Sequence, residues 1–177
     1  MDVHFLNRYL DTNGDGTGTK AAIGNYAGAA ESFYIEPGDG YDFVISRMLV
    51  TIQDSGVMNA DDYGFGGALT NGVAVRHLDV DQGVKRDLLD GLPIKSHAMW
   101  GQVCYDMQET SFGTGDKFVQ VRWTFSKSGI PIVLKTGERL EVLLNDDLTK
   151  LTGHTFVVQG YAMDNEYQNL GGKITRP

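Results

Sequence analysis

From residue 32 onward, apolar side chains recur at every second position, which is the period of a β-strand and not of a helix. The clearest run is "YDFVISRMLVTIQD" at residues 41–54. One of its faces consists of Phe43, Ile45, Arg47, Leu49 and Thr51, and the other consists of Val44, Ser46, Met48, Val50 and Ile52. Because both faces carry apolar residues, we expect a long strand that is either covered on both sides or passes from the core to a subunit contact.

The same period predicts further strands, separated by turn sequences such as "TNG", "DQG", "GTGD" and "KTG". The expected long strands cover residues 42–53, 98–108, 118–126, 138–145 and 154–163, and a shorter one lies in "GVAVRHLDV". Helical periodicity over ten or more residues is not found, and only "NADDYG" and "NDDLTKLTG" suggest a single helical turn. This pattern predicts an all-β fold, an antiparallel β-sandwich that is jelly-roll-like.

The first 31 residues do not continue this pattern, because "DTNGDGTGTKAAIGNYAGAA" (residues 11–30) is rich in glycine and small residues. We therefore expect three parts: an extended glycine-rich N-terminal arm at 1–31, the jelly-roll-like sandwich at 32–164, and a C-terminal tail at 165–177. At 177 residues, the chain is long enough for one domain with a substantial core.

Charge and composition narrow the class of protein. The net charge of −8, without any basic cluster longer than "VKR", argues against a nucleic-acid partner. The chain has no apolar run near 18 residues, so we expect no membrane partner. Its N-terminus has neither the basic nor the apolar region of a secretion signal, and Cys104 is the single cysteine, so we expect synthesis in a reducing cytoplasm.

The stretch "DTNGDG" contains half of a calcium-loop pattern. Asp11, Asn13 and Asp15 alternate before Gly16, as in D-x-[DN]-x-[DN]-G. The twelfth position of such a loop needs a bidentate acid, but Ala22 stands there, and no helices are expected on either side. Calcium is therefore the minority interpretation, and the alternatives are a flexible segment or one that becomes ordered against a partner.

Candidate catalytic groups are scattered. The four histidines, at 4, 77, 97 and 154, form no pair with metal-ligand spacing, and we find no nucleophile elbow or phosphate loop. "DVD" at 79–81 and the acids at 61–62 and 146–147 are interpreted as turn, loop and cap residues, Cys104 as a buried thiol, and Trp100 and Trp123 as core. We therefore expect no catalytic residues, no cofactor and no enzyme activity.

Several segments together resemble virion structural proteins of tailed bacteriophages, of the capsid decoration or cement type. These segments are "FLNRYLDTNGDGTGTKAAIGNYAGAAESFYI", "YDFVISRMLVTIQDSG", "LTNGVAVRH", "DGLPIKSHAMW", "KFVQVRWTFSKSG" and "LEVLLNDDLTKLTGHTFVVQGY". They span most of residues 5–161 in the layout of an arm followed by a sandwich. The resemblance implies a structural role in the virion, on the capsid surface, after synthesis in the host bacterial cytoplasm. It also implies many copies and contact with the major capsid protein or a tail component.

On this interpretation, the arm lies along a neighbouring subunit, and the expected partner-binding residues are Asp11, Asn13, Asp15, Thr17, Thr19, Lys20 and Tyr26. The apolar residues on both faces of residues 41–52 predict self-association as a homotrimer or another small cyclic oligomer. Two alternatives remain open. One is a tail or neck virion protein, of adaptor or fibre-associated type. The other is a carbohydrate-binding β-sandwich whose exposed aromatic platform contains Tyr63, Phe65 and Trp100.

Overall fold

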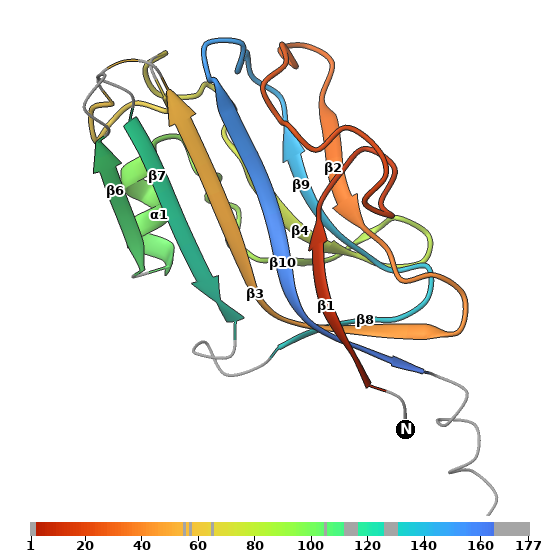
Figure 1. Ribbon diagram of the computed structural model, residues 1–177. Helices are drawn as coiled ribbons and strands as arrows, with labels where there is room; N and C mark the ends of the chain where they lie inside the picture. The colour runs from red at the N-terminus through yellow and green to blue at the C-terminus, as the bar shows by residue number, and fades with distance from the viewer. Residues whose placement is uncertain are drawn as a thin grey trace, which may run out of the picture.

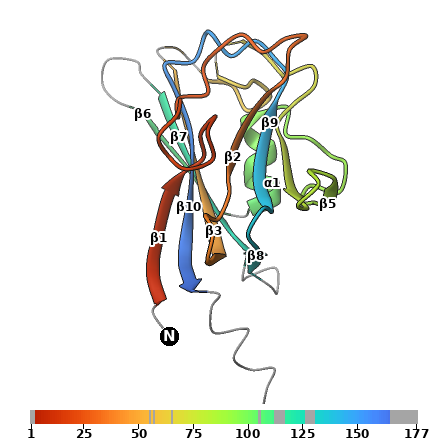
Figure 2. The ribbon, with the colours of Figure 1, turned by 90° about the vertical axis from the view of Figure 1, so that its right-hand side faces the viewer.

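The structure is a computed structural model, which describes residues 3–164 except 55, 57, 65, 105, 112–116 and 126–130. Two antiparallel sheets pack face to face with most of the apolar side chains between them (Figures 1 and 2). The predicted all-β sandwich is therefore confirmed. The jelly-roll arrangement remains a prediction, and the expected tail at 165–177 lies outside the described residues.

The larger sheet has six strands, and its outer face is turned toward the viewer in Figure 1. Across the sheet, the order is β1 (Val3–Tyr9), β10 (Gly153–Asp164), β3 (Tyr41–Asp54), β7 (Lys117–Thr124) and β6 (Met107–Ser111). The sixth strand, β8 (Ile132–Leu134), pairs with the first part of β3, and β7 pairs with the rest.

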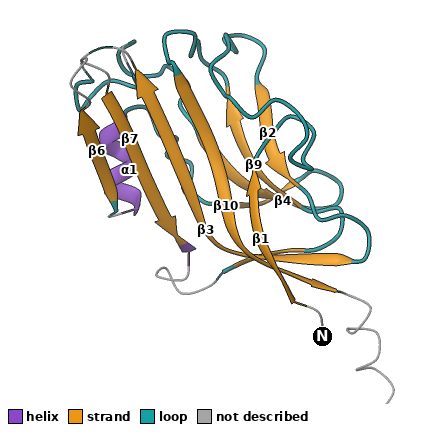
Figure 3. Ribbon diagram, in the orientation of Figure 1, coloured by secondary structure: helices purple, strands orange, loops and turns teal. Residues whose placement is uncertain are grey.

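The smaller sheet has four strands, in the order β2 (Glu31–Ile35), β9 (Arg139–Leu144), β4 (Ala74–Leu78) and β5 (Val84–Asp87). It does not extend over β6 and β7. Their inner side is covered instead by the helix α1 (His97–Cys104), as Figure 3 shows. The second layer of the sandwich is therefore part sheet and part helix.

The prediction of a strand at 98–108 is wrong, because α1 occupies the first part of this range and β6 begins at Met107. The buried residues of the segment are His97, Trp100 and Cys104. Their spacing of three and four places them on one face of a helix. The ring of Trp100 packs on that of Trp123 in β7, with centroids 6.4 Å apart. Burial of this one face determines the helix, and the local alternation of residue types does not.

The other four long strands predicted from the sequence are confirmed, with bounds close to those in the structure. The ranges 42–53, 118–126, 138–145 and 154–163 correspond to β3, β7, β9 and β10, although residue 126 is not described. The core face of β3 contains Met48, Val50 and Ile52, and the opposite face contains Arg47, Leu49, Thr51 and Gln53. The largest fully buried side chains include Phe33, Ile35, Leu134, Leu140, Leu144 and Phe156.

A β-bulge interrupts the pairing of β10 with β3 between Gln159 and Gly160. The backbone of β3 comes so close here that a Cβ atom on residue 160 would collide with the carbonyl oxygen of Val44. Only glycine permits this approach, and the bulge increases the local twist of the long strand pair.

The prediction of an extended N-terminal arm also needs correction. Residues 3–9 form β1 and pair with β10 along their whole length, from Val3 with Met163 to Tyr9 with Val157. Leu6, Leu10 and Ala22 are buried in the same core as the rest of the sandwich. The sandwich therefore begins at residue 3 and not at residue 32. Apolar alternation in "VHFLNRY" was the signal for this strand.

Candidate interaction surface

The glycine-rich stretch after β1 folds around one buried carboxylate. Asp11 is fully buried; its Oδ1 accepts the backbone N–H of Gly14 at 2.6 Å, and its Oδ2 accepts that of Gly18 at 2.5 Å. The backbone of Asp11 also exchanges hydrogen bonds with that of Tyr34, at 3.2 and 2.9 Å. Gly14 has a φ of 77°, in the region that favours glycine. The loop is thus ordered by its own chain.

The side chains of the half calcium pattern do not converge on one point. Asp15 is exposed and accepts the hydroxyl and the backbone N–H of Thr17, at 2.7 and 2.8 Å, and these bonds lower the pKa of Asp15. Both oxygens of Asp11 already accept backbone hydrogen bonds. Within the described ranges, no three His, Cys, Asp or Glu side chains are placed to hold a metal ion.

The expected partner-binding residues differ in their accessibility. The exposed ones are Asn13, Asp15, Thr17, Thr19 and Lys20. The prediction that Asp11 contacts a partner is wrong, because this side chain is fully buried. Tyr26 is half-buried, and its ring packs on that of Phe33 with centroids 5.9 Å apart. Such a loop presents a preformed polar surface instead of a chain that becomes ordered on binding.

A chain of hydrogen bonds crosses the core between the N-terminal segment, the loop after β3, and α1. His154 Nδ1 lies 2.9 Å from the carbonyl oxygen of Ala22, which only accepts, so this nitrogen carries the proton. Nε2 of His154 then accepts the hydroxyl of Tyr63 at 2.7 Å, and the hydroxyl oxygen accepts Nε1–H of Trp100 at 3.3 Å. Burial lowers the pKa of His154 to about 4 and raises the pKa of Tyr63 above its usual range, so both are neutral near pH 7.

The burial of this network overturns the expected aromatic platform. Tyr63 and Trp100 are 2% and 0% exposed, so neither can stack on a sugar, and Phe65 lies outside the described residues. The interpretation of Trp100, Trp123 and Cys104 as core residues is confirmed. Burial raises the pKa of the Cys104 thiol to about 12, which makes it a poor nucleophile.

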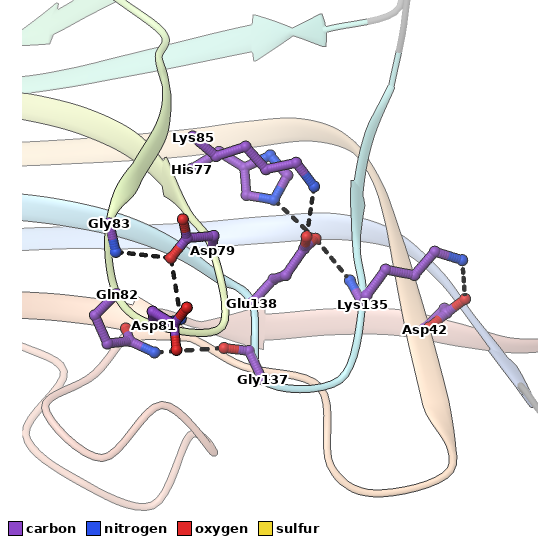
Figure 4. Close-up of polar contacts among 10 residues, drawn as sticks. All are labelled: Asp42, His77, Asp79, Asp81, Gln82, Gly83, Lys85, Lys135, Gly137 and Glu138. Carbon is purple, nitrogen blue, oxygen red and sulfur yellow. Dashed lines mark hydrogen bonds and ion pairs between the residues drawn. The ribbon is translucent and has the colours of Figure 1, made fainter.

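A second polar cluster joins the β4–β5 hairpin to the turn between β8 and β9 (Figure 4). The carboxylate of Glu138 accepts Nε2–H of His77 and the backbone N–H of Lys135, both at 3.0 Å, and also pairs with Nζ of Lys85. Burial alone would raise the pKa of Glu138, but these bonds together lower it. Lys135 extends the cluster to the buried Asp42. Sequence spacing does not reveal the contact between His77 and Glu138, because the residues are 61 positions apart.

Among the acids interpreted as turn, loop and cap residues, Asp79 and Asp147 accept hydrogen bonds from residues that closely follow them. Oδ1 of Asp79 accepts the backbone N–H groups of Asp81 and Gly83, at 3.0 and 2.8 Å, in the β4–β5 turn (Figure 4). Asp147 accepts the hydroxyl and N–H of Thr149. Asp146, in contrast, reaches across the fold and accepts three successive backbone N–H groups, those of Thr70, Asn71 and Gly72.

The β1 edge of the larger sheet, with which no other described strand pairs, carries exposed apolar side chains that the sequence interpretation missed. Phe5 is 79% and Val3 is 52% exposed, and Tyr161, which pairs directly with Phe5 in register, is 39% exposed. We call Val3, Phe5 and Tyr161 the β1 patch. In an antiparallel pair, residues directly opposite each other lie on the same face, so the patch is continuous across β1 and β10.

In the described part of the chain, no helix is long and apolar enough to cross a membrane. No protein-family model matches this chain, and no curated protein or solved structure shows significant similarity to it.

Proposed function

We propose that this chain is a structural virion protein of a tailed bacteriophage, a capsid decoration (cement) protein that binds and stabilises the shell of the major capsid protein. The resemblance in segment layout supports the virion, and the β1 patch on a free sheet edge is the observation that supports an interface-forming role. The jelly-roll type of sandwich belongs to the same proposal.

The physical argument rests on the edge position of β1. An edge strand presents unpaired backbone N–H and C=O groups, and natural proteins usually protect such edges with charges, proline or a covering segment. β1 contains no proline and a single charged residue, Arg8, at its C-terminal end, and its outward side chains at 3 and 5 are apolar. Such an edge is suited to binding another chain by strand addition, where the backbone provides affinity and the side chains provide specificity.

The same edge is suited to self-association. A homotrimer or another small closed oligomer would bury the β1 patches of several copies and leave the rest of each surface for the capsid. Thr17 and Lys20, which are exposed in the loop after β1, are proposed as additional capsid contacts.

The test is to add purified protein to capsids that lack it and to measure co-sedimentation. We expect the unmodified chain to bind and Phe5→Asp to bind poorly, because the acid must be desolvated at an apolar contact. Leu92→Asp is the matched control, because Leu92 is 70% exposed and lies away from β1, in the β5–α1 connection. Thermal melts of both variants should match that of the unmodified chain, since neither side chain is in the core.

Equal binding of Phe5→Asp and Leu92→Asp would show that the β1 patch is needed neither for direct attachment to the capsid nor for an oligomer that attaches. Absence of the protein from purified virions would overturn the proposal itself. Quantitative mass spectrometry of the virions decides between two virion locations: a copy number in proportion to the major capsid protein supports decoration, and a few copies per particle support the neck or tail.

A further inference from the structure

The outer face of the larger sheet carries a second surface, distinct from the β1 patch. Its strand register aligns outward residues into rows that run across the sheet. Tyr9 pairs with Val157, Val157 with Leu49, and Leu49 with Arg122, whose backbone N–H bonds to the carbonyl of Asp106 at 2.9 Å. None of the described strands or helices covers this face (Figures 1 and 2).

This first row is apolar for most of its length. Tyr9 is 42% exposed, and Val157 and Leu49 are half-buried in the sheet surface. The row ends in the ion pair of Arg122 with Asp106, at 3.5 Å, in which the two side chains are 57% and 41% exposed. Five chain segments at strand spacings of 4.7–4.9 Å make a strip about 19 Å long.

The next row is polar but uncharged. Thr155 pairs with Thr51, Thr51 with Gln120, and Gln120 with Gln108. Both glutamine side chains are exposed, and the two threonines are half-buried. Hydroxyl and amide groups thus run alongside the apolar strip, and together the two rows line a hollow of about 230 Å³.

We propose that this hollow binds a neutral oligosaccharide. A sugar ring has an apolar face of C–H groups and an edge of hydroxyl groups, and the two rows present the matching surfaces side by side. The C–H face would lie on Val157, Leu49 and the ring of Tyr9, over which the Nζ of Lys20 also lies, 5.3 Å from the ring centroid. The hydroxyl edge would exchange hydrogen bonds with Gln120 and Gln108, since an amide both donates and accepts.

Charge favours a neutral ligand. The one charged pair in the hollow, Arg122 with Asp106, is balanced, and the chain as a whole carries −8. An anionic ligand would be repelled by this net charge. Arg122, the one cation among the lining residues, is already paired, and the Nζ of Lys20 lies beside the hollow, 5.3 Å from the centroid of the Tyr9 ring. Paired Arg and Asp groups are also suited to bidentate hydrogen bonds with adjacent hydroxyls. The site differs from the buried Tyr63 and Trp100 and shares no residue with the β1 patch.

The first experiment is affinity electrophoresis of the whole chain in gels that contain one neutral polysaccharide each: starch, cellulose-type β-glucan, mannan, galactan or xylan. We expect at least one of them to retard the protein. A hexasaccharide of the retained type is then titrated by calorimetry. Tyr9→Ala and Gln120→Ala should each weaken binding about tenfold, because each removes a contact made through the hollow.

Gln102→Ala is the matched control, because Gln102 is an exposed glutamine on α1, in the other layer. It should bind as the unmodified chain does. Retardation by none of the five glycans would overturn the proposal, as would binding to dextran sulfate alone or equal weakening by Gln102→Ala. Phe5→Asp should retain glycan binding, so failure of the capsid proposal and failure of this one are distinguishable.

Discussion

The hydroxyl of Tyr63 donates to Nε2 of His154 across 2.7 Å inside the core, where both side chains are buried. Tyr63 belongs to the loop after β3 and His154 to β10, so the bond connects a long loop to the central strand pair. The same histidine reaches the carbonyl of Ala22 with its other nitrogen. One imidazole therefore fixes the positions of two segments that have no strand pairing of their own with each other.

We expect Tyr63→Phe to destabilise the fold. The substitution leaves Nε2 of His154 and Nε1–H of Trp100 buried without their partner, which costs about 1–3 kcal/mol. For a domain of this size, each kcal/mol corresponds to about 2–4 °C in Tm. Thermal unfolding measures the loss, and Tyr161→Phe, at a tyrosine that is 39% exposed, is the control that should not change Tm. An unchanged Tm for Tyr63→Phe would mean that the hydrogen-bond chain does not stabilise the fold.

The free energy of unfolding should decrease as the pH is lowered from about 6.5 to about 4. Burial lowers the pKa of His154 in the folded protein to about 4, so within this window the unfolded chain binds a proton that the folded chain does not. Burial also lowers the pKa of His97, which acts in the same direction. Urea unfolding at a series of pH values measures the slope. His154→Asn should flatten it, and an equal slope in that variant would assign the pH dependence to other groups.

Leu10→Ala should destabilise the protein by about 2–5 kcal/mol, the range for a fully buried leucine. An extended arm outside the sandwich would give almost no effect. Phe5→Ala is the control on the same segment, because its side chain is mostly exposed and should cost little. Chemical denaturation of both variants compares the two positions directly, and equal small effects would restore the arm interpretation.

Calcium should not stabilise the glycine-rich loop. Asp11 already accepts two backbone N–H groups, and Asp15 accepts from Thr17. We expect equal Tm values with added calcium and with a chelator. Asp11→Ala should lower Tm in both conditions, because it leaves the backbone N–H groups of Gly14 and Gly18 without their acceptor. A rise in Tm with calcium that Asp15→Ala abolishes would instead identify a metal site.

The sequence by itself determined the class of fold and most of the strands. Strand periodicity is a local property: residues such as Val50 and Ile52 must face one side whatever lies there, so alternation in the chain predicts β3 and β10 almost to their ends. Turn residues are local as well, and the interpretation of Asp79 and Asp147 as turn acids is confirmed for the same reason.

Only the tertiary structure decided the rest, because those features depend on contacts between distant parts of the chain. α1 forms where Trp100 packs on Trp123 and on the inner side of β7. The alternating pattern within residues 97–104 does not predict this contact. β1 is part of the sandwich because it pairs with β10, which lies about 150 residues later in the chain. In the same way, His77 meets Glu138 only after the hairpin and the turn are packed together, and the two rows of the outer face exist only in the register of five adjacent segments. Packing at long range thus decided which local patterns became a helix, an edge or a surface site.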